Sequence, residues 1–241
     1  MGYWKSHVIN LTLFVILYGF FDLRDLPLVT KSSNVHIKAD SAESVKIKKR
    51  LLEYSSERER LSINYLEKRH GIKKTRPTID PKIIVVHYTN GGTIESIYRY
   101  FNSPTIENSR EFNKKQSILN VSSHYLIDRD GSIYQIMEDS LFARHTIGLN
   151  YCAIGIENIG GPGAPLTKKQ IEANARLIRR LVSLYKIEYV IGHSEYLSFK
   201  NSSWWKELDK NYFTIKQDPG EQAMKEIRLL INDLKLFSAP K

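Results

Sequence analysis

Three short apolar runs constrain the fold of this chain more than any other feature. They are "KIIVV" at 82–86, "AIGIENI" at 153–159 and "EYVIGH" at 188–193. Continuous runs of this length, rich in β-branched residues, are typical of strands that are buried on both faces of a sheet. A helical pattern at 166–186 lies between the second and third runs, and strands interspersed with helices are typical of α/β domains.

The segment "HYLIDRDGSIYQI" at 124–136 adds a pair of antiparallel strands. Two alternating runs flank Asp130-Gly131, and this dipeptide is a strong signal for a tight hairpin turn. A hairpin beside buried strands, with helices between them, predicts an α/β fold. We expect a single mixed β-sheet flanked by helices.

Two helices carry recognisable start signals. Thr167 and Gln170 form a capping box at the beginning of the helical pattern named above, and Thr93 is placed to cap a helix at 93–101. The stretch at 102–121 is polar and irregular. A loop of that length is usually functional or disordered.

The segment before the first strand has a helical stripe. Its apolar residues recur at helical spacing and are Ile47, Leu51, Tyr54, Leu61 and Tyr65. Basic residues at 68–70, followed by Gly71, form a typical helix C-terminus. We therefore expect one or two helices here, making a helical extension at 43–75 that packs on a domain at 76–241.

The N-terminus has the pattern of an export signal. Lys5 precedes an almost wholly apolar run from Val8 to Phe21. We expect a signal peptide or an uncleaved signal anchor at 1–22, and a polar linker at 23–42. The run is shorter than the about 20 residues of a membrane span. Three outcomes stay open for this segment: removal as a signal peptide, retention as a membrane anchor, and a buried N-terminal helix. The predicted location is exported, either periplasmic or extracellular, with possible membrane anchoring.

The charge of the chain favours an acidic partner. Its net charge is +10, which suits a nucleic acid, an anionic lipid or an anionic cell-wall polymer. No zinc-finger, RNA-recognition or basic-zipper pattern is present in the sequence, so we expect no nucleic acid. The single cysteine, Cys152, lies in an apolar context and is interpreted as a buried structural thiol.

Two histidines stand at the ends of predicted buried strands. His87 follows "IIVV", His193 follows "YVIG", and strand ends are where α/β proteins place their chemistry. Asp218 follows 25 positions after His193, in "KQDPG". Two imidazoles and a carboxylate are a ligand set of catalytic zinc sites, with the fourth position left for water. Histidines that are only hydrogen-bonded in the core are the alternative.

Six fragments give the sequence a family resemblance. In order along the chain they are "VVHYT", "SSHYLIDRDGSIYQI", "RHTIG", "AIGIENIG", "VIGHSE" and "KQDPG". Together they resemble the type-2 zinc N-acetylmuramoyl-L-alanine amidases, the superfamily that includes the peptidoglycan recognition proteins. The resemblance covers roughly residues 80–235 and implies a mixed sheet flanked by helices.

The resemblance also implies a set of site residues. The metal ligands of one Zn²⁺ per chain map onto His87, His193 and Asp218. The catalytic glutamate maps onto Glu157, and the catalytic lysine maps onto Lys216. In an extended segment residues i and i+2 share a face, so Lys216 and Asp218 can point into one pocket.

Two further residues resemble the substrate side of the family site. They are Arg144 and His145 in "ARHTIG". His145 is expected to contact the sugar or the stem peptide. An ordinary loop histidine, or a third metal ligand in place of Asp218, are the alternatives.

The implied activity is zinc-dependent cleavage of the amide between N-acetylmuramic acid and L-alanine, in peptidoglycan or its muropeptide fragments. The first rival is a non-catalytic peptidoglycan-binding module. The second is a membrane-anchored basic protein that acts through its charged N-terminal helices and keeps a vestigial catalytic fold.

Overall fold

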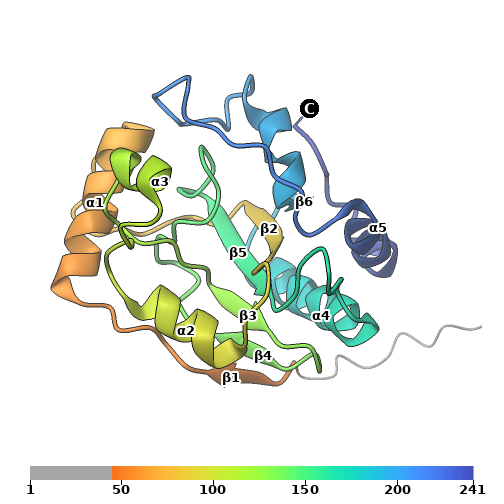
Figure 1. Ribbon diagram of the computed structural model, residues 1–241. Helices are drawn as coiled ribbons and strands as arrows, with labels where there is room; N and C mark the ends of the chain where they lie inside the picture. Colours follow the sequence, from red (N-terminus) through yellow and green to blue (C-terminus); the bar gives the residue numbers. More distant parts are fainter. Residues whose placement is uncertain (1–44, 241) are drawn as a thin grey trace, which may run out of the picture. The chain divides into compact units, whose positions relative to one another are not determined.

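The computed structural model describes residues 45–240, in which six strands form one mixed sheet (Figure 1). The strands are Ile47–Lys49 (β1), Ile83–Tyr88 (β2), Tyr125–Ile127 (β3), Ile133–Gln135 (β4), Ala153–Asn158 (β5) and Tyr189–Gly192 (β6). Their order is β1-β4-β3-β5-β2-β6, and only β3 and β4 pair antiparallel. The expected mixed sheet and hairpin are therefore confirmed. The signal and linker predicted at 1–42 lie outside the described residues.

Helices cover both faces of this sheet (Figure 1). They are Ser56–His70 (α1), Ile94–Asn102 (α2), Glu111–Gln116 (α3), Lys168–Leu184 (α4) and Glu221–Leu230 (α5), with short 3₁₀ segments at His193–Phe199 (η1) and Asn232–Leu234 (η2). Helices α4 and α5 pack their apolar side chains on one face, and α2 packs on the other. Thr93 and Thr167 both form the expected caps. Within residues 45–240 no helix is long and apolar enough to cross a membrane.

The segment at 47–54 is not helical, which corrects the expected extension. Ile47 pairs with Ile133, so β1 adds a parallel edge strand to β4. Helix α1 begins only after Ser55, whose hydroxyl accepts a hydrogen bond from the backbone N–H of Arg58. The helical spacing of 47, 51 and 54 competes here with backbone pairing to a strand that is distant in sequence, and the pairing prevails.

Helix α1 is tied to the rest of the sheet domain through a buried cation. Arg58 is almost fully buried, and its guanidinium donates hydrogen bonds to the carbonyl oxygens of Phe101, Asn102 and Ser103 at the end of α2. Carbonyls at a helix C-terminus lack partners within the helix, so a cation there is stabilising. Ser44–Lys241 accordingly form one compact unit, and α1 is part of it.

His70, at the end of α1, makes the stability of the fold depend on pH. Its ring packs among the rings of Tyr65, Phe142 and Tyr151, and burial lowers its pKa to about 3. In the unfolded chain the imidazole protonates near pH 6.5. The stability that depends on a neutral His70 is therefore present above pH 6.5 and is lost as the pH falls toward 3.

We expect a His70→Leu variant to lose this dependence. Between pH 7.5 and pH 5 the unfolding free energy of the wild type should fall by about 2 kcal/mol more than that of the variant, at about 1.4 kcal/mol per pH unit. Urea unfolding of both proteins at the two pH values measures the difference. An equal loss in both proteins would contradict the assignment.

Candidate metal centre and catalytic pocket

Three parallel strands bring the expected site residues into one row. His87 pairs in register with Glu157 across β2 and β5, and Val86 pairs with Gly192 across β2 and β6. His193 is the next residue after Gly192, so it continues the row beside His87. Residues paired in register point to the same face of a sheet, and the strands end here with their carboxyl ends together. The sheet therefore places two histidines and a glutamate side by side.

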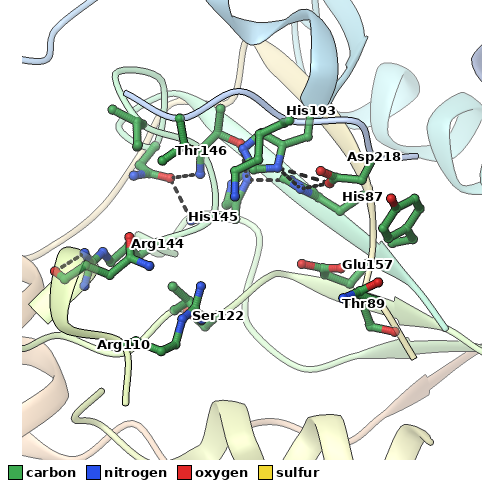
Figure 2. Close-up of a pocket in the computed structure, with 18 of the residues that line it drawn as sticks. His87, Thr89, Arg110, Ser122, Arg144, His145, Thr146, Glu157, His193 and Asp218 are labelled. Atoms are coloured by element: carbon green, nitrogen blue, oxygen red, sulfur yellow. Dashed lines mark hydrogen bonds and ion pairs between the residues drawn. The ribbon is translucent and has the colours of Figure 1, made fainter. Parts of the chain in front are cut away.

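Asp218 reaches this row from a distant loop (Figure 2). The backbone carbonyl of Asp218 accepts a hydrogen bond from the N–H of Ser194 at 2.8 Å. This contact joins the "KQDPG" segment to the start of η1, next to His193. The long connection between the two residues thus returns to the same sheet edge, as the predicted ligand set requires.

The three candidate ligands converge on one point. Nδ1 of His87 lies 3.0 Å from Nδ1 of His193, and each lies 3.1 Å from Oδ2 of Asp218. All three residues are buried, with exposed fractions of 2%, 7% and 8%. Tetrahedral zinc with bonds of about 2.0–2.2 Å places its ligand atoms about 3.3 Å apart. The donor set and its spacing therefore fit a zinc ion.

The charge states of these groups also suit a cation. Burial lowers the pKa of His193 to about 4, so its imidazole is neutral and keeps a lone pair. Burial raises the pKa of Asp218, but its hydrogen bonds with His193 and His87 outweigh burial and hold the pKa well below its usual range. Neutral imidazoles and an ionised carboxylate are the forms that bind metal.

Glu157 has the properties of a proton carrier. Burial raises the pKa of its carboxyl to about 7, with His87 opposing and Asp218 adding to the shift. Its Oε2 atom is buried and has no hydrogen-bond partner among the described residues. A buried carboxyl that titrates near neutral pH and has a free oxygen is suited to take up and release a proton.

The three candidate ligands and Glu157 line one pocket of about 570 Å³. This volume is typical of small-molecule sites. Lys216 lines the same pocket, and its positive charge lowers the pKa of Glu157. Tyr100, Arg110 and Tyr212 line it as well. None of these three belongs to a sequence motif: Tyr100 lies on the expected helix α2, whereas Arg110 and Tyr212 lie in segments without a periodic pattern.

Arg144 lies in the pocket wall with its guanidinium already engaged. It donates hydrogen bonds to the carbonyl oxygens of Asn113, Ser117 and Leu119, and to the hydroxyl of Tyr212. These bonds tie α3 and the segment that follows it to Tyr212 in the loop after η1. The expected contact with substrate stays a prediction for Arg144.

His145 packs directly against a candidate metal ligand. Its Nδ1 lies 3.1 Å from Nε2 of His87, and its Nε2 lies 3.1 Å from the carbonyl oxygen of Ala153. Burial, and then the neighbouring His87, lower its pKa well below the ordinary value, so the ring is neutral. Its predicted contact with substrate also stays a prediction. The third place at the candidate centre is taken by Asp218 and not by His145.

The loop that carries Lys216 is anchored to α1. The guanidinium of Arg69 forms two hydrogen bonds to the buried carboxylate of Glu207, at 2.6 and 3.3 Å, and stacks over the ring of Tyr212. Trp205, which belongs to the same loop, packs against Gly148 and Tyr196. Helix α1 therefore supports the pocket wall, a contact between distant segments that no sequence pattern predicts.

The fold and the site define an α/β protein with a pocket built around a two-histidine, one-carboxylate candidate metal centre. The family model described as N-acetylmuramoyl-L-alanine amidase (Amidase_2) matches residues 75–221, and the chain belongs to this family. The activity of that family is peptidoglycan amide hydrolysis, which is thus the activity class of this chain.

The comparisons also give individual relatives. The endolysins of Klebsiella phage KP32 and Escherichia phage T7 are each 27% identical over 109 residues, which is 41% of this chain and 72% of theirs. Among solved structures, the amidase LysC from Clostridium intestinale URNW is 19% identical with a TM-score of 0.48, covering 78% of this chain and 97% of LysC. Bumblebee PGRP-SA is 18% identical with a TM-score of 0.49, covering 81% of this chain and 99% of its own.

Proposed function

We propose that this chain is a zinc-dependent amidase that cleaves the bond between the lactyl group of N-acetylmuramic acid and L-alanine of the stem peptide. The observation that carries the proposal is the convergence of His87, His193 and Asp218 beside Glu157 in one pocket. Family membership supports the bond that is cleaved. Peptidoglycan or its muropeptide fragments are the proposed substrates.

The residues of the pocket have different roles in amide hydrolysis. Zn²⁺ held by the three ligands would lower the pKa of a bound water from 15.7 to about 7 and polarise the amide carbonyl. Oε2 of Glu157 accepts a proton from the attacking water, and the protonated carboxyl then delivers it to the leaving amine of L-alanine. A carboxyl with a pKa near neutrality can perform both steps.

Lys216 is proposed to stabilise the oxyanion that forms when water attacks the carbonyl. Its ammonium group lines the pocket and acts on Glu157 and His193 through its charge. A positioned donor of this kind strengthens its interaction as negative charge develops on the oxygen. The same residue therefore contributes to the rate and little to ground-state binding.

We expect Lys216→Met to reduce kcat by about 10²–10³-fold with little change in KM or zinc content, since losing one oxyanion donor costs about 2.7–4 kcal/mol. Steady-state cleavage of a muropeptide and metal analysis of the same samples measure both. Lys225→Met on the exposed side of α5 is a matched control and should keep the wild-type rate. An unchanged kcat in Lys216→Met would remove this residue from the mechanism.

The result that would overturn this proposal is a non-catalytic peptidoglycan-binding module. It would need the pocket but no metal chemistry. The presence of all three candidate ligands and of Glu157 favours catalysis. Metal content and cleavage products, measured on one preparation, distinguish the two.

The fragment for that experiment is set by the fold. Residues 44–241 form the compact unit, so removal of 1–43 spares β1 and α1, whereas removal of 1–75 would take an edge strand and the Arg58 contacts with it. We expect about one zinc per chain and free stem peptides that begin with L-alanine, identified by mass spectrometry. Intact muropeptides with a folded, zinc-free protein would support the binding module instead.

We also propose that the protein is exported and acts in the periplasm or outside the cell. The basic start and the apolar run before residue 22 support export, and the net charge of +10 suits an anionic cell wall. Cell fractionation tests the export and shows whether this run also attaches the protein to the membrane. A cytoplasmic location of the full chain would contradict the proposal.

A further inference from the structure

The ring of His145 lies between a candidate metal ligand and strand β5 (Figure 2). Its plane stands at 89° to the ring of His87, with the ring centres 5.2 Å apart. One nitrogen faces Nε2 of His87, and the other faces the carbonyl oxygen of Ala153, each at 3.1 Å. His145 thus joins the metal centre to the main chain of the sheet.

The partners of His145 determine which atoms carry protons. The carbonyl oxygen of Ala153 can only accept, so Nε2 of His145 must donate to it. A neutral imidazole carries one proton, so Nδ1 of His145 is an acceptor. Nε2 of His87 must then donate to that acceptor. When the His87 ring carries a single proton, this donation leaves its lone pair on Nδ1, the atom that faces His193 and Asp218.

The surroundings of His145 hold its ring in this place. A Cβ atom on Gly155 would lie 2.8 Å from Cγ of His145, so only glycine lets the ring lie flat on β5. The side-chain oxygen of Asn150 accepts hydrogen bonds from the backbone N–H groups of His145 and Thr146, at 2.8 and 2.6 Å. The hydroxyl of Thr146 lies 2.9 Å from Nδ1 of His145 and can donate to the same acceptor.

We propose that His145 is a positioning residue that sets the tautomer and the orientation of His87 for zinc binding. The inference rests on the zinc centre of the proposed function. Histidines that bind metals commonly donate their second N–H to a protein acceptor, and losing that acceptor typically costs about 10–100-fold in metal affinity. Here the acceptor is another imidazole, which is itself held by the sheet. This role differs from the contact with substrate expected from the sequence.

Two substitutions of nearly the same shape test the proposal. His145→Asn keeps an acceptor oxygen close to the position of Nδ1, whereas His145→Leu keeps the bulk and removes the acceptor. We expect His145→Leu to bind zinc about 10–100-fold more weakly than the wild type, and His145→Asn to recover most of that loss. Competition with a chromogenic chelator measures the affinities. His70→Leu, also a buried histidine but remote from the centre, should bind zinc like the wild type.

The tautomer of His87 gives a readout independent of activity. Long-range ¹H–¹⁵N spectra of the zinc-free protein should show His87 protonated at Nε2 in the wild type and in His145→Asn, and a mixture of tautomers in His145→Leu. A His145→Leu protein with wild-type zinc affinity and an unchanged His87 tautomer overturns the proposal, even if its melting temperature falls. A wild type that binds no zinc would refute the proposed function and this inference together, whereas an unaffected variant beside a zinc-binding wild type refutes this inference alone.

Discussion

Replacing His87 with alanine is expected to abolish amide cleavage while the fold and wall binding persist. The residue supplies one of three converging ligand atoms, and it is buried at the centre of the row formed by β5, β2 and β6. Without it, zinc would lose a ligand, and with it both the activation of water and the polarisation of the carbonyl. These effects are worth several kcal/mol, and about 4 kcal/mol corresponds to about 10³-fold in rate.

Three measurements on one sample check this result: zinc content, muropeptide turnover and binding to insoluble peptidoglycan. His70→Ala is the matched control, because it also removes a buried imidazole but lies at the end of α1, outside the pocket lining. It should keep both zinc and turnover if it remains folded. A His87→Ala protein that cleaves at the wild-type rate would show that the metal model is wrong.

The second large effect is expected for Glu157→Gln. The amide has nearly the same shape as the carboxyl but cannot accept a proton from water, so we expect kcat to fall by about 10²–10⁴-fold. Zinc content should stay at the wild-type level, because Glu157 is not one of the converging ligands. Glu172→Gln on α4 is the matched control and should leave the rate unchanged.

The pH profile separates this role from a structural one. The carboxyl must be ionised to accept a proton, so wild-type activity should fall as the pH drops through its pKa. Burial raises that pKa to about 7, and a bound cation nearby would move it lower. The residual activity of Glu157→Gln should lack this acid limb. An acid limb that persists in the variant would assign the proton transfer to another group.

Local patterns in the sequence accounted for most of the elements that carry the site. The runs that became β2, β5 and β6 are continuous and apolar because both faces of these strands are covered, so they stand out without any knowledge of the fold. The capping residues Thr93 and Thr167 are equally local, because a cap depends on residues within one turn. The hairpin around Asp130-Gly131 follows from the turn alone.

The segment that became β1 shows where such patterns fail. Ile47 and Leu51 have helical spacing, but Ile47 is paired with Ile133 on a strand more than eighty positions away. No local signal reports that pairing. The hydrogen bonds of Arg144 and Arg58 could not be predicted for a similar reason, since their partners are carbonyl groups far away in the sequence.

Local sequence patterns were enough to predict the buried strands, the hairpin and the residue types at the strand ends, because strand burial, helix capping and tight turns depend on neighbours along the chain. The folded chain was needed to see that His145 contacts His87, that α1 is bonded to the loop before Lys216, and that burial raises the pKa of Glu157 to about 7. Each of these depends on burial and on contacts between segments far apart in sequence. Desolvation and hydrogen bonding act between groups that are close in space, so their effects on these residues depend on the folded structure.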